Sequence, residues 1–363
     1  MPTFFVVLIS IYLAGNIYIF RRGAQALVAQ PFGVKVLLAV LFWYGALAFI
    51  GSFLARNTKL PVVLSHTAHE IGTGWLVFTL YMVLCLIIFD LFRLFNFPCK
   101  YGFYISLFLT LSLLSYGYYN YQHPKTEVFN IVINKQTVHN EQPLKVVSVS
   151  DVHLGYGTDK EELKQYVEMI NAQQPDLILI GGDLIDNSVV PLYEEKMMEE
   201  LAELKAPLGI YMVPGNHEYI SGIRKSMQFI NETPIRLLRD DVVTLPGGIQ
   251  IIGRDDRSNK SRLSLQELVK NIDPAKPVIL LDHQPYNLSD TENAGIDLQF
   301  SGHTHRGQVW PVSLITDHLF DQSYGYRKWG NSHIYVSSGL SLWGPPFRIG
   351  TDSELVVFNI TCK

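Results

Sequence analysis

The distribution of charge along the chain constrains its fold more than any other feature of the sequence. Of its 62 Lys, Arg, Asp and Glu residues, only nine lie in residues 1–122. Soluble domains average about 25% charged residues, so this first third is too poor in charge for an ordinary soluble surface. The other 53 charges lie in the remaining 241 residues, which have the charge density of a soluble protein. We therefore predict a membrane anchor in residues 1–122 and a soluble domain in residues 125–363.

The anchor is predicted to consist of four transmembrane helices. Four apolar runs cover residues 3–20, 34–55, 75–94 and 101–119, and each is close to the ~20 residues that span a bilayer as a helix. Arg21 and Arg22 follow the first run, and the positive-inside rule keeps them in the cytoplasm, with the N-terminus outside. Four spans then place the soluble domain on the outer face of the membrane.

Polar residues beside these runs have ordinary explanations. Asp90 ends the third run and is expected to form an ion pair with Arg93, three residues on. His66 and His69 lie between the second and third runs, at a spacing that would put both imidazoles on one helical face. A metal site there lacks a third ligand, so ordinary polarity of a loop is the preferred interpretation.

Charge and cysteine content exclude several classes of protein. Residues 1–122 carry +5 and the rest carry −9, so the soluble domain is acidic. A general nucleic-acid binder needs a basic surface to neutralise phosphates, so no nucleic-acid partner is expected. The three cysteines, with no CxxC pair, are too few for a disulfide framework and do not indicate a zinc ribbon.

The soluble domain has the pattern of an α/β fold. Helical periodicity indicates helices at 160–171, 192–204 and 263–270, between short runs rich in β-branched residues. These runs predict strands at 128–133, 144–150, 177–180, 210–213, 249–252, 278–281, 334–336 and 355–360. Strands that alternate with helices predict a layered domain, and the late strands without intervening helices indicate a mixed sheet.

Polar residues follow five of the apolar runs, at the point where each strand is expected to end. They are Asp151 and His153, Asp183 and Asp186, Asn216 and His217, His283, and His303 and His305. Ligand sites of α/β proteins lie beyond the carboxyl ends of the strands. Imidazole and carboxylate ligands suit Mn, Fe or Zn. The set is too large for one ion but sufficient for two ions that share a bridging carboxylate, an arrangement used in phosphate-ester hydrolysis.

The order of these motifs resembles that of a known family. Asp-x-His, Gly-Asp, Gly-Asn-His-Glu, a lone His and Gly-His-x-His follow one another over about residues 145–350, as in the calcineurin-like metallophosphoesterases. The resemblance implies a fold of two mixed β-sheets flanked by helices. It also implies a hydrolase that acts on phosphoric esters.

The resemblance also implies the roles of the site residues. It predicts two divalent ions, with manganese preferred and iron or zinc as alternatives. The first ion would be bound by Asp151, His153 and His305, the second by Asn216, His283 and His303, and Asp183 would bridge them. A hydroxide between the ions would attack the phosphorus. His217, oriented by Asp186, would stabilise the transition state and protonate the leaving oxygen, as a histidine near neutral pKa can do.

Departures from the subfamilies narrow the substrate. Asn187 and Ser188 stand where protein Ser/Thr phosphatases carry Arg and Gly. The stretch 336–348 resembles the membrane-associated bacterial branch, which includes phosphodiesterases and pyrophosphatases of lipid-linked substrates such as UDP-diacylglucosamine. We therefore expect a phosphodiester or pyrophosphate of a lipid or envelope molecule as substrate. The expected location is a bacterial cytoplasmic membrane, with the catalytic domain on the periplasmic face, membrane lipids as partners and no obligate protein partner.

Three arginines are candidates for contact with the substrate. Arg306, Arg254 and Arg348 could each bind a second phosphate or a headgroup oxygen, although each also suits an ordinary ion pair. The apolar segment 311–320, after Trp310, is expected to be a packed loop rather than a lid at the membrane interface. A broad phosphomonoesterase or nucleotidase facing the periplasm is an alternative function. A non-catalytic sensor or scaffold is disfavoured because the ligand set and His217 are complete.

Overall fold

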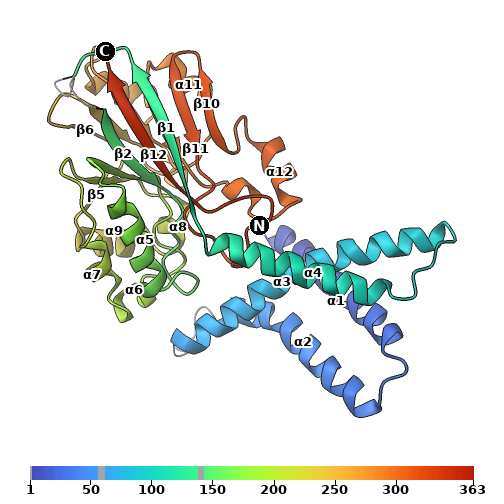
Figure 1. Ribbon diagram of the computed structural model, residues 1–363. Helices are drawn as coiled ribbons and strands as arrows, with labels where there is room; N and C mark the ends of the chain where they lie inside the picture. Colours follow the sequence, from blue (N-terminus) through green and yellow to red (C-terminus); the bar gives the residue numbers. More distant parts are fainter. Residues whose placement is uncertain (1, 56–61, 138–142) are drawn as a thin grey trace. The chain divides into compact units, whose positions relative to one another are not determined.

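The computed structural model describes residues 2–55, 62–137 and 143–363 (Figure 1). It divides into two compact units. The helical unit comprises Met1–Tyr119 and Gly344–Ile349, and the α/β unit comprises Asn120–Trp343 and Gly350–Lys363. The predicted boundary near residue 122 lies close to this division, but the short segment 344–349 was not expected to belong with the helices.

The helical unit contains four long helices among the described residues. They are α1 (Pro2–Ala26), α2 (Phe32–Ala55), α3 (Val62–Leu94) and α4 (Gly102–Tyr121). Helix α3 begins well before the apolar run that predicted it, so the backbones of His66 and His69 are helical and the expectation of a loop there was wrong. The side chain of His66 lies outside the described residues.

Three of these helices have the length and composition of membrane spans. In the part of the chain that the structure describes, these spans are Val6–Ala26, Phe32–Gly51 and Thr67–Leu94. Helix α4 forms where the fourth run predicted it, but the serines and tyrosines in its sequence lower its hydropathy. The predicted count of four spans is therefore not confirmed.

A half-buried polar cluster links α1 to α3 inside the helical unit. Tyr18 donates a hydrogen bond to Asp90, at 2.5 Å, and Arg22 forms an ion pair with the same carboxylate at 2.7 Å. The expected pairing of Asp90 with Arg93 was wrong. The ion-pair partner is Arg22 of α1, because Asp90 faces that helix. The spacing of residues along a single helix cannot reveal a partner on another helix.

The α/β unit is built on two six-stranded mixed sheets, as the family resemblance implied. The first has the strand order β1-β12-β2-β3-β4-β5 and the second has the order β10-β11-β9-β8-β7-β6. The strands of the first sheet are β1 (Lys125–Ile133), β2 (Leu144–Val149), β3 (Leu177–Ile180), β4 (Ile210–Met212), β5 (Ile235–Leu237) and β12 (Glu354–Cys362). Those of the second are β6 (Asp241–Thr244), β7 (Gln250–Gly253), β8 (Val278–Leu281), β9 (Leu298–Ser301), β10 (Gly325–Trp329) and β11 (Ser332–Val336).

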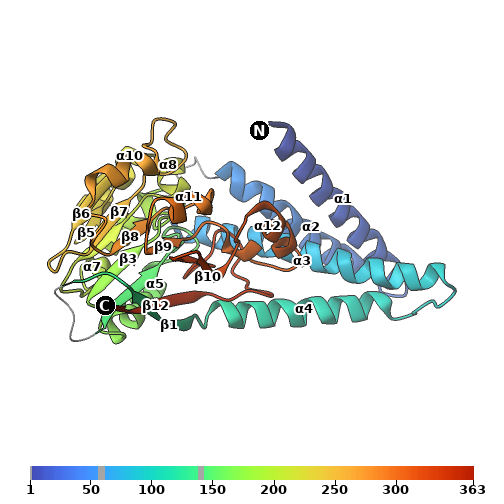
Figure 2. The same cartoon turned by 90° about the horizontal axis from the view of Figure 1, so that it is seen from above.

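Alternation along the central strands divides their side chains between two cores. In β3, Ile178 and Ile180 pack in the core under the helices, whereas Leu177 and Leu179 pack in the core between the sheets. Helices α5, α6, α7 and α9 cover the first sheet (Figure 1), and α10 packs against β7 and β8 of the second (Figure 2). The parallel strands are apolar on both faces because both faces are covered.

The helices of this unit are mostly short. They are α5 (Lys160–Ala172), α6 (Val190–Glu194), α7 (Met197–Leu201), α8 (Asn216–Ile220), α9 (Ile223–Asn231), α10 (Leu265–Leu268), α11 (Leu288–Asn293) and α12 (Val312–Leu319). Two 3₁₀ turns, η1 (Val269–Asn271) and η2 (His305–Gly307), complete the set. The single helix predicted at 192–204 is two helices, because Lys196 adopts a left-handed backbone conformation between them.

Candidate metal centre

The polar residues that follow five strands meet at one place in the α/β unit. In the first sheet, β2, β3 and β4 are parallel neighbours, so the residues after their carboxyl ends lie along one edge. In the second sheet, β8 and β9 are parallel neighbours and end beside each other. The loops that follow these five strands carry all nine of the residues singled out from the sequence.

One group of potential ligands forms around Asp151. His305 Nε2 lies 3.4 Å from Asp151 Oδ1, and His153 Nε2 lies 3.7 Å from the same oxygen. The two imidazole Nε2 atoms are 3.2 Å apart. The ligand atoms of these three residues all lie within 4.8 Å of one another, a spacing that suits a shared cation.

A second group forms around Asp183. His283 Nε2 lies 3.1 Å from Asp183 Oδ2, and His303 completes a trio whose ligand atoms lie within 4.8 Å of one another. The same Asp183 oxygen lies 4.0 Å from His153 Nε2 of the first group. Asp183 is therefore placed between the two groups, where a bridging carboxylate would be.

Tight backbone turns aim these side chains at one another. Asp151, His153, Asp183, His303 and His305 all have positive φ, between 47° and 74°. This left-handed conformation costs of order 1–3 kcal/mol for a residue other than glycine, so the surrounding hydrogen bonds must impose it. The backbone N–H of His303 donates to the Asp151 carboxylate at 3.0 and 3.1 Å.

Two glycines of the motifs are required by close approach of the backbone to these carboxylates. A Cβ on Gly302 would collide with Asp151 Oδ2 and with Ser150 Oγ. A Cβ on Gly215 would collide with Asp183 Oδ1. The glycines that precede Asn216 and His303 therefore leave room for the carboxylates.

His217 lies beside the two groups and is held by Asp186. Its Nδ1 lies 3.0 Å from Asp186 Oδ1 and 3.2 Å from the Asp186 backbone oxygen. Because both neighbours are acceptors, Nδ1 carries a proton and Nε2 is left for another partner. The backbone N–H of His217 also donates a hydrogen bond to Asp183 Oδ1, at 2.8 Å. This bond connects His217 to the residue that would bridge the two ions.

The electrostatics of the site are those of buried carboxylates held among imidazoles. Burial alone would raise the pKa values of Asp151, Asp183 and Asp186. The charges and hydrogen bonds of neighbouring histidines outweigh burial, so the net effect is to hold these pKa values well below the usual range. Burial lowers the pKa of His153, but hydrogen bonds to Asp151 and Asp186 raise it to about 10. Burial and the charge of His283 lower the pKa of His303 to about 4, so that imidazole is neutral.

These residues fit divalent cations. The three carboxylates are at least 95% buried, and their ion-pair partners among the described residues are histidines. The buried Oδ1 of Asn216 has no hydrogen-bond partner among the described residues. Two divalent ions would supply the positive charge that Lys and Arg do not supply here, and they would satisfy the Asn216 oxygen, a hard ligand that suits such ions.

One residue that positions this site was not singled out from the sequence. Glu218 is fully buried and accepts backbone N–H groups from Gly215 (2.7 Å), Ile185 (2.9 Å) and Asp183 (3.1 Å). It thereby joins the loop after β3 to the loop after β4. Its place as the last residue of the Gly-Asn-His-Glu motif was the available signal.

The three candidate arginines lie in different surroundings. Arg306 extends over the ring of Tyr324, with 4.7 Å between the guanidinium carbon and the ring centroid. Arg254 forms an ion pair with Asp282 at 2.7 Å. Arg348 is fully buried and belongs to the segment Gly344–Ile349 of the helical unit. Its backbone N–H donates a hydrogen bond to the backbone oxygen of Gly117.

Aromatic side chains lie beside the centre near His217 and near His303, and the sequence analysis did not include them in the site. The ring of Trp343 lies edge-on to the His217 ring, with centroids 6.1 Å apart, and is 44% exposed. The ring of Phe320 lies 6.1 Å from His303 and 4.9 Å from Tyr286. Apolar contact surface is therefore available next to the potential ligands.

The segment before Phe320 is a helix with an exposed apolar face, and the expectation of a packed loop was wrong. Helix α12 exposes Leu314, Ile315 and Leu319 at 60%, 58% and 64%. Trp310, just before it, is 51% exposed. Such side chains normally face a partner or a membrane rather than water.

Comparison with known proteins adds the family context. The chain matches the family model described as calcineurin-like phosphoesterase over residues 144–307. An uncharacterized metallophosphoesterase of Helicobacter pylori is 35% identical over 72% of this chain and 70% of its own length. One of Campylobacter jejuni is 28% identical over 99% of this chain and 98% of its own length. A Danio rerio protein named transmembrane protein with metallophosphoesterase domain is 28% identical over 71% of this chain and 62% of its own length.

Proposed function

This chain belongs to the calcineurin-like metallophosphoesterase family, and on that premise we propose that it hydrolyses a phosphodiester or pyrophosphate bond of a lipid or envelope-derived molecule. The chain is a hydrolase of phosphoric esters with apolar N-terminal helices. To this we add the kind of bond that is hydrolysed, the source of the substrate and the role of each site residue.

The observation that carries the proposal is the convergence of two ligand groups on Asp183. Asp151, His153 and His305 would hold one divalent ion, and His283 and His303 would hold the other, with the buried Oδ1 of Asn216 as its third ligand. Manganese is the preferred metal, and iron or zinc would also suit these ligands. When bound, the two ions would supply positive charge opposite the phosphoryl oxygens and activate water as the nucleophile.

His217 would supply the proton for the leaving group. Asp186 holds a proton on Nδ1 by its position 3.0 Å away, so a protonated Nε2 would be the donor to the leaving oxygen. His217 is 7% exposed, which limits competition from bulk water for that proton. The general acid and its orienting carboxylate are thus fixed before substrate binds.

Apolar surfaces beside the centre support a lipid-linked substrate. Leu314, Ile315 and Leu319 of α12 are exposed, and Phe320 after them lies near His303. Trp343 offers a second apolar surface near His217. A chain with membrane-spanning helices is held at the surface where such substrates reside, which raises their effective concentration.

Among the candidate arginines, we propose Arg306 as the contact for a second phosphate or a headgroup oxygen. It directly follows the ligand His305. Its guanidinium lies over Tyr324, an arrangement that leaves the charge available to an anion. Arg254 and Arg348 are weaker candidates, because the first is paired with Asp282 and the second is buried in the helical unit.

We propose that α4 is a fourth span and that the α/β unit faces the periplasmic side of a bacterial cytoplasmic membrane. Helix α4 has 20 residues and would be about 30 Å long, the thickness of a bilayer core. Its side chains Phe108, Leu109 and Leu111 are 43–70% exposed, as expected of residues that contact lipid. Four spans with Arg21 and Arg22 inside place the following domain outside.

The substrate class is tested with the purified full chain in detergent and excess Mn²⁺. The measurement compares kcat/KM for bis(p-nitrophenyl) phosphate, p-nitrophenyl phosphate, and a lipid phosphodiester and a lipid pyrophosphate in mixed micelles. The proposal predicts that a lipid diester or pyrophosphate is the best substrate. A preference for the soluble monoester would contradict it and favour a phosphomonoesterase.

A further inference from the structure

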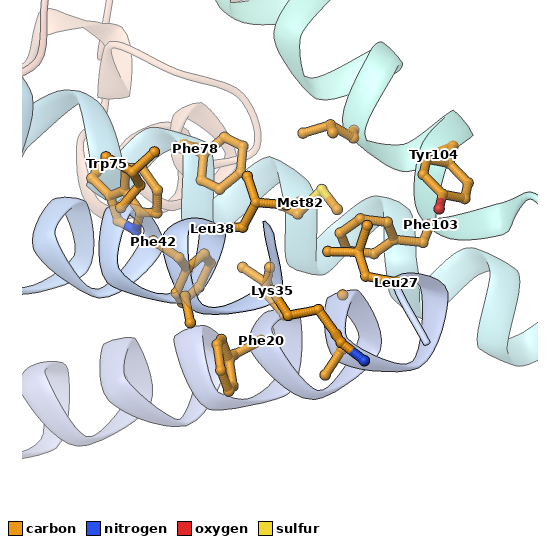
Figure 3. Close-up of a pocket in the computed structure, with 16 residues that line it drawn as sticks. Phe20, Leu27, Lys35, Leu38, Phe42, Trp75, Phe78, Met82, Phe103 and Tyr104 are labelled. Atoms are coloured by element: carbon orange, nitrogen blue, oxygen red, sulfur yellow. The ribbon is translucent and has the colours of Figure 1, made fainter. Parts of the chain in front are cut away.

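The helical unit contains a partly open apolar cavity that is separate from the candidate metal centre. Its volume is about 420 Å³, within the range of roughly 300–1,000 Å³ typical of ligand pockets. Side chains of α1, α2, α3 and α4 line it, with Phe20, Phe42, Phe78 and Phe103 around the space (Figure 3). Among the described residues that line it, Lys35 alone carries a charge.

Two polar side chains of the cavity, Lys35 and Tyr104, lie at the end away from Trp75 (Figure 3). Lys35 Nζ donates to the Val28 oxygen at 3.3 Å, and the Tyr104 hydroxyl donates to the Ala26 oxygen at 3.0 Å. Both acceptors lie at the turn between α1 and α2, which joins the spans Val6–Ala26 and Phe32–Gly51. A turn between two spans lies at the bilayer surface, so the ammonium of Lys35 lies at the depth of lipid headgroups.

The rest of the cavity extends toward the bilayer core. Lys35 reaches along one side of the space, with its nitrogen at the end away from Trp75 (Figure 3). Between Lys35 and Phe42, helix α2 rises about 10 Å, so the cavity continues about two turns into the membrane. A polar entrance above an apolar interior matches the chemistry of a lipid, with a charged head and a hydrocarbon chain.

The charge of Lys35 is available to such a lipid. An ammonium group has three donors, so Lys35 can hold a phosphate oxygen in addition to the Val28 oxygen. The neighbouring Arg22 is engaged by Asp90 at 2.7 Å and by Gln25 at 2.8 Å. Basic pockets between membrane helices at this depth are known to bind lipid headgroups.

We propose that this cavity binds one acyl chain of an anionic phospholipid while Lys35 holds the headgroup phosphate. A zwitterionic lipid neutralises its phosphate with its own ammonium group, so a single lysine favours a lipid with net negative charge. The site lies in the helical unit and is independent of the hydrolytic reaction. Its occupancy is therefore measured without reference to activity.

The test titrates the delipidated full chain in detergent with dioleoyl phosphatidylglycerol or dioleoyl phosphatidylcholine and counts bound lipids by native mass spectrometry. The wild type is expected to bind phosphatidylglycerol more tightly. Lys35→Gln should weaken that binding roughly tenfold, because it removes a hydrogen bond to a charged group, and leave phosphatidylcholine binding unchanged. Lys100→Gln is the matched control, since Lys100 precedes α4 near Tyr104 but does not line the cavity.

A second variant tests the apolar part of the site. Ala39 lines the cavity, and Ala39→Phe should fill the space and reduce binding of both lipids. If the Ala39→Phe chain does not fold, Leu38→Phe is used in its place, since Leu38 also lines the cavity. Equal losses in Lys35→Gln and Lys100→Gln would overturn the proposal, because they would indicate general attraction of anionic lipid. Unchanged lipid binding in the filled variant would overturn it as well.

Discussion

At the scale of single residues, we propose that the site separates metal binding from proton transfer. Two carboxylates and five imidazoles form overlapping trios whose potential ligand atoms lie within 4.8 Å of one another, and Asp186 lies 3.0 Å from His217. Their neighbours nevertheless differ, and so do the roles that we propose for them. Burial, the largest cause, lowers the pKa of His303 to about 4, so its imidazole is available to a metal ion without first losing a proton. His217 is instead turned by Asp186 so that Nε2 is left for the substrate.

The role of His217 predicts a dependence on the leaving group. His217→Asn should lower kcat roughly 100- to 10,000-fold for an alkyl ester, whose alkoxide needs a proton, and much less for a p-nitrophenyl ester. Steady-state kinetics with both esters measure this, and metal analysis of the variant serves as the control. Equal losses for the two leaving groups would count against proton donation by His217.

The three backbone bonds to Glu218 predict a structural role for this side chain. Glu218→Ala should lower the free energy of unfolding of the α/β unit by about 1–3 kcal/mol, because buried N–H groups lose their acceptor. It should also weaken metal binding, since the loops that carry Asp183 and Asn216 lose their common partner. Thermal unfolding with and without Mn²⁺ measures both effects. Glu168→Ala, at an exposed position of α5, is the control, and an equal effect there would refute the role.

At the scale of elements, local pattern predicted the strands that are apolar on both faces. Strands β3 and β8 have the predicted bounds because each is a continuous run of Leu, Ile and Val ended by Gly or Asp. Strand β5 escaped prediction because it has only three residues. Strand β10 escaped it because it lies at the edge of its sheet and carries the exposed Arg327 and Lys328. Their pairing partners come from elsewhere in the chain, which a local pattern does not show.

The site was more predictable than the elements around it. Its ligand types stand directly after the strands, so the parallel sheet brings them together. The loops that complete its rim were not predictable in this way. Trp343 reaches His217 through a long connection before β12, and α12 is amphipathic over only eight residues, too few for helical periodicity to distinguish an exposed face from a buried one.

The exposed face of α12 predicts a difference between substrates in bilayers and in solution. Changing Leu314, Ile315 and Leu319 together to Ser should reduce hydrolysis of a bilayer-embedded ester at least about tenfold, because less apolar surface contacts the membrane. Hydrolysis of soluble bis(p-nitrophenyl) phosphate should stay within about twofold, since these residues are surface residues away from the ligand groups. Rates in proteoliposomes measure the ratio, and an unchanged ratio would argue against membrane contact by α12.

At the scale of the whole molecule, the number of spans decides which compartment the substrate occupies. Helices α1, α2 and α3 have the composition of spans. If α4 also crosses, the α/β unit lies outside, as we propose, whereas three crossings would place it in the cytoplasm. A reporter enzyme that is active only in the periplasm, fused after Lys363, should be active in the full chain. Activity of a cytoplasm-specific reporter at that position would contradict the proposed orientation.

The charge of the whole molecule is consistent with a metal-dependent enzyme. The residues after 122 carry −9, which is an unfavourable setting for binding phosphate unless cations intervene. Asp151 and Asp183 contribute to that acidity and lie where two divalent ions would neutralise them. The proposed hydrolysis therefore depends above all on divalent ions bound at these residues.

The most direct test follows hydrolysis of bis(p-nitrophenyl) phosphate by the chelator-stripped full chain as Mn²⁺ is added back. We expect no hydrolysis after stripping, recovery that saturates near two ions per chain, and no recovery in Asp183→Asn, which removes the proposed bridge. Persistent hydrolysis by the fully stripped wild type, or full recovery in Asp183→Asn, would contradict it.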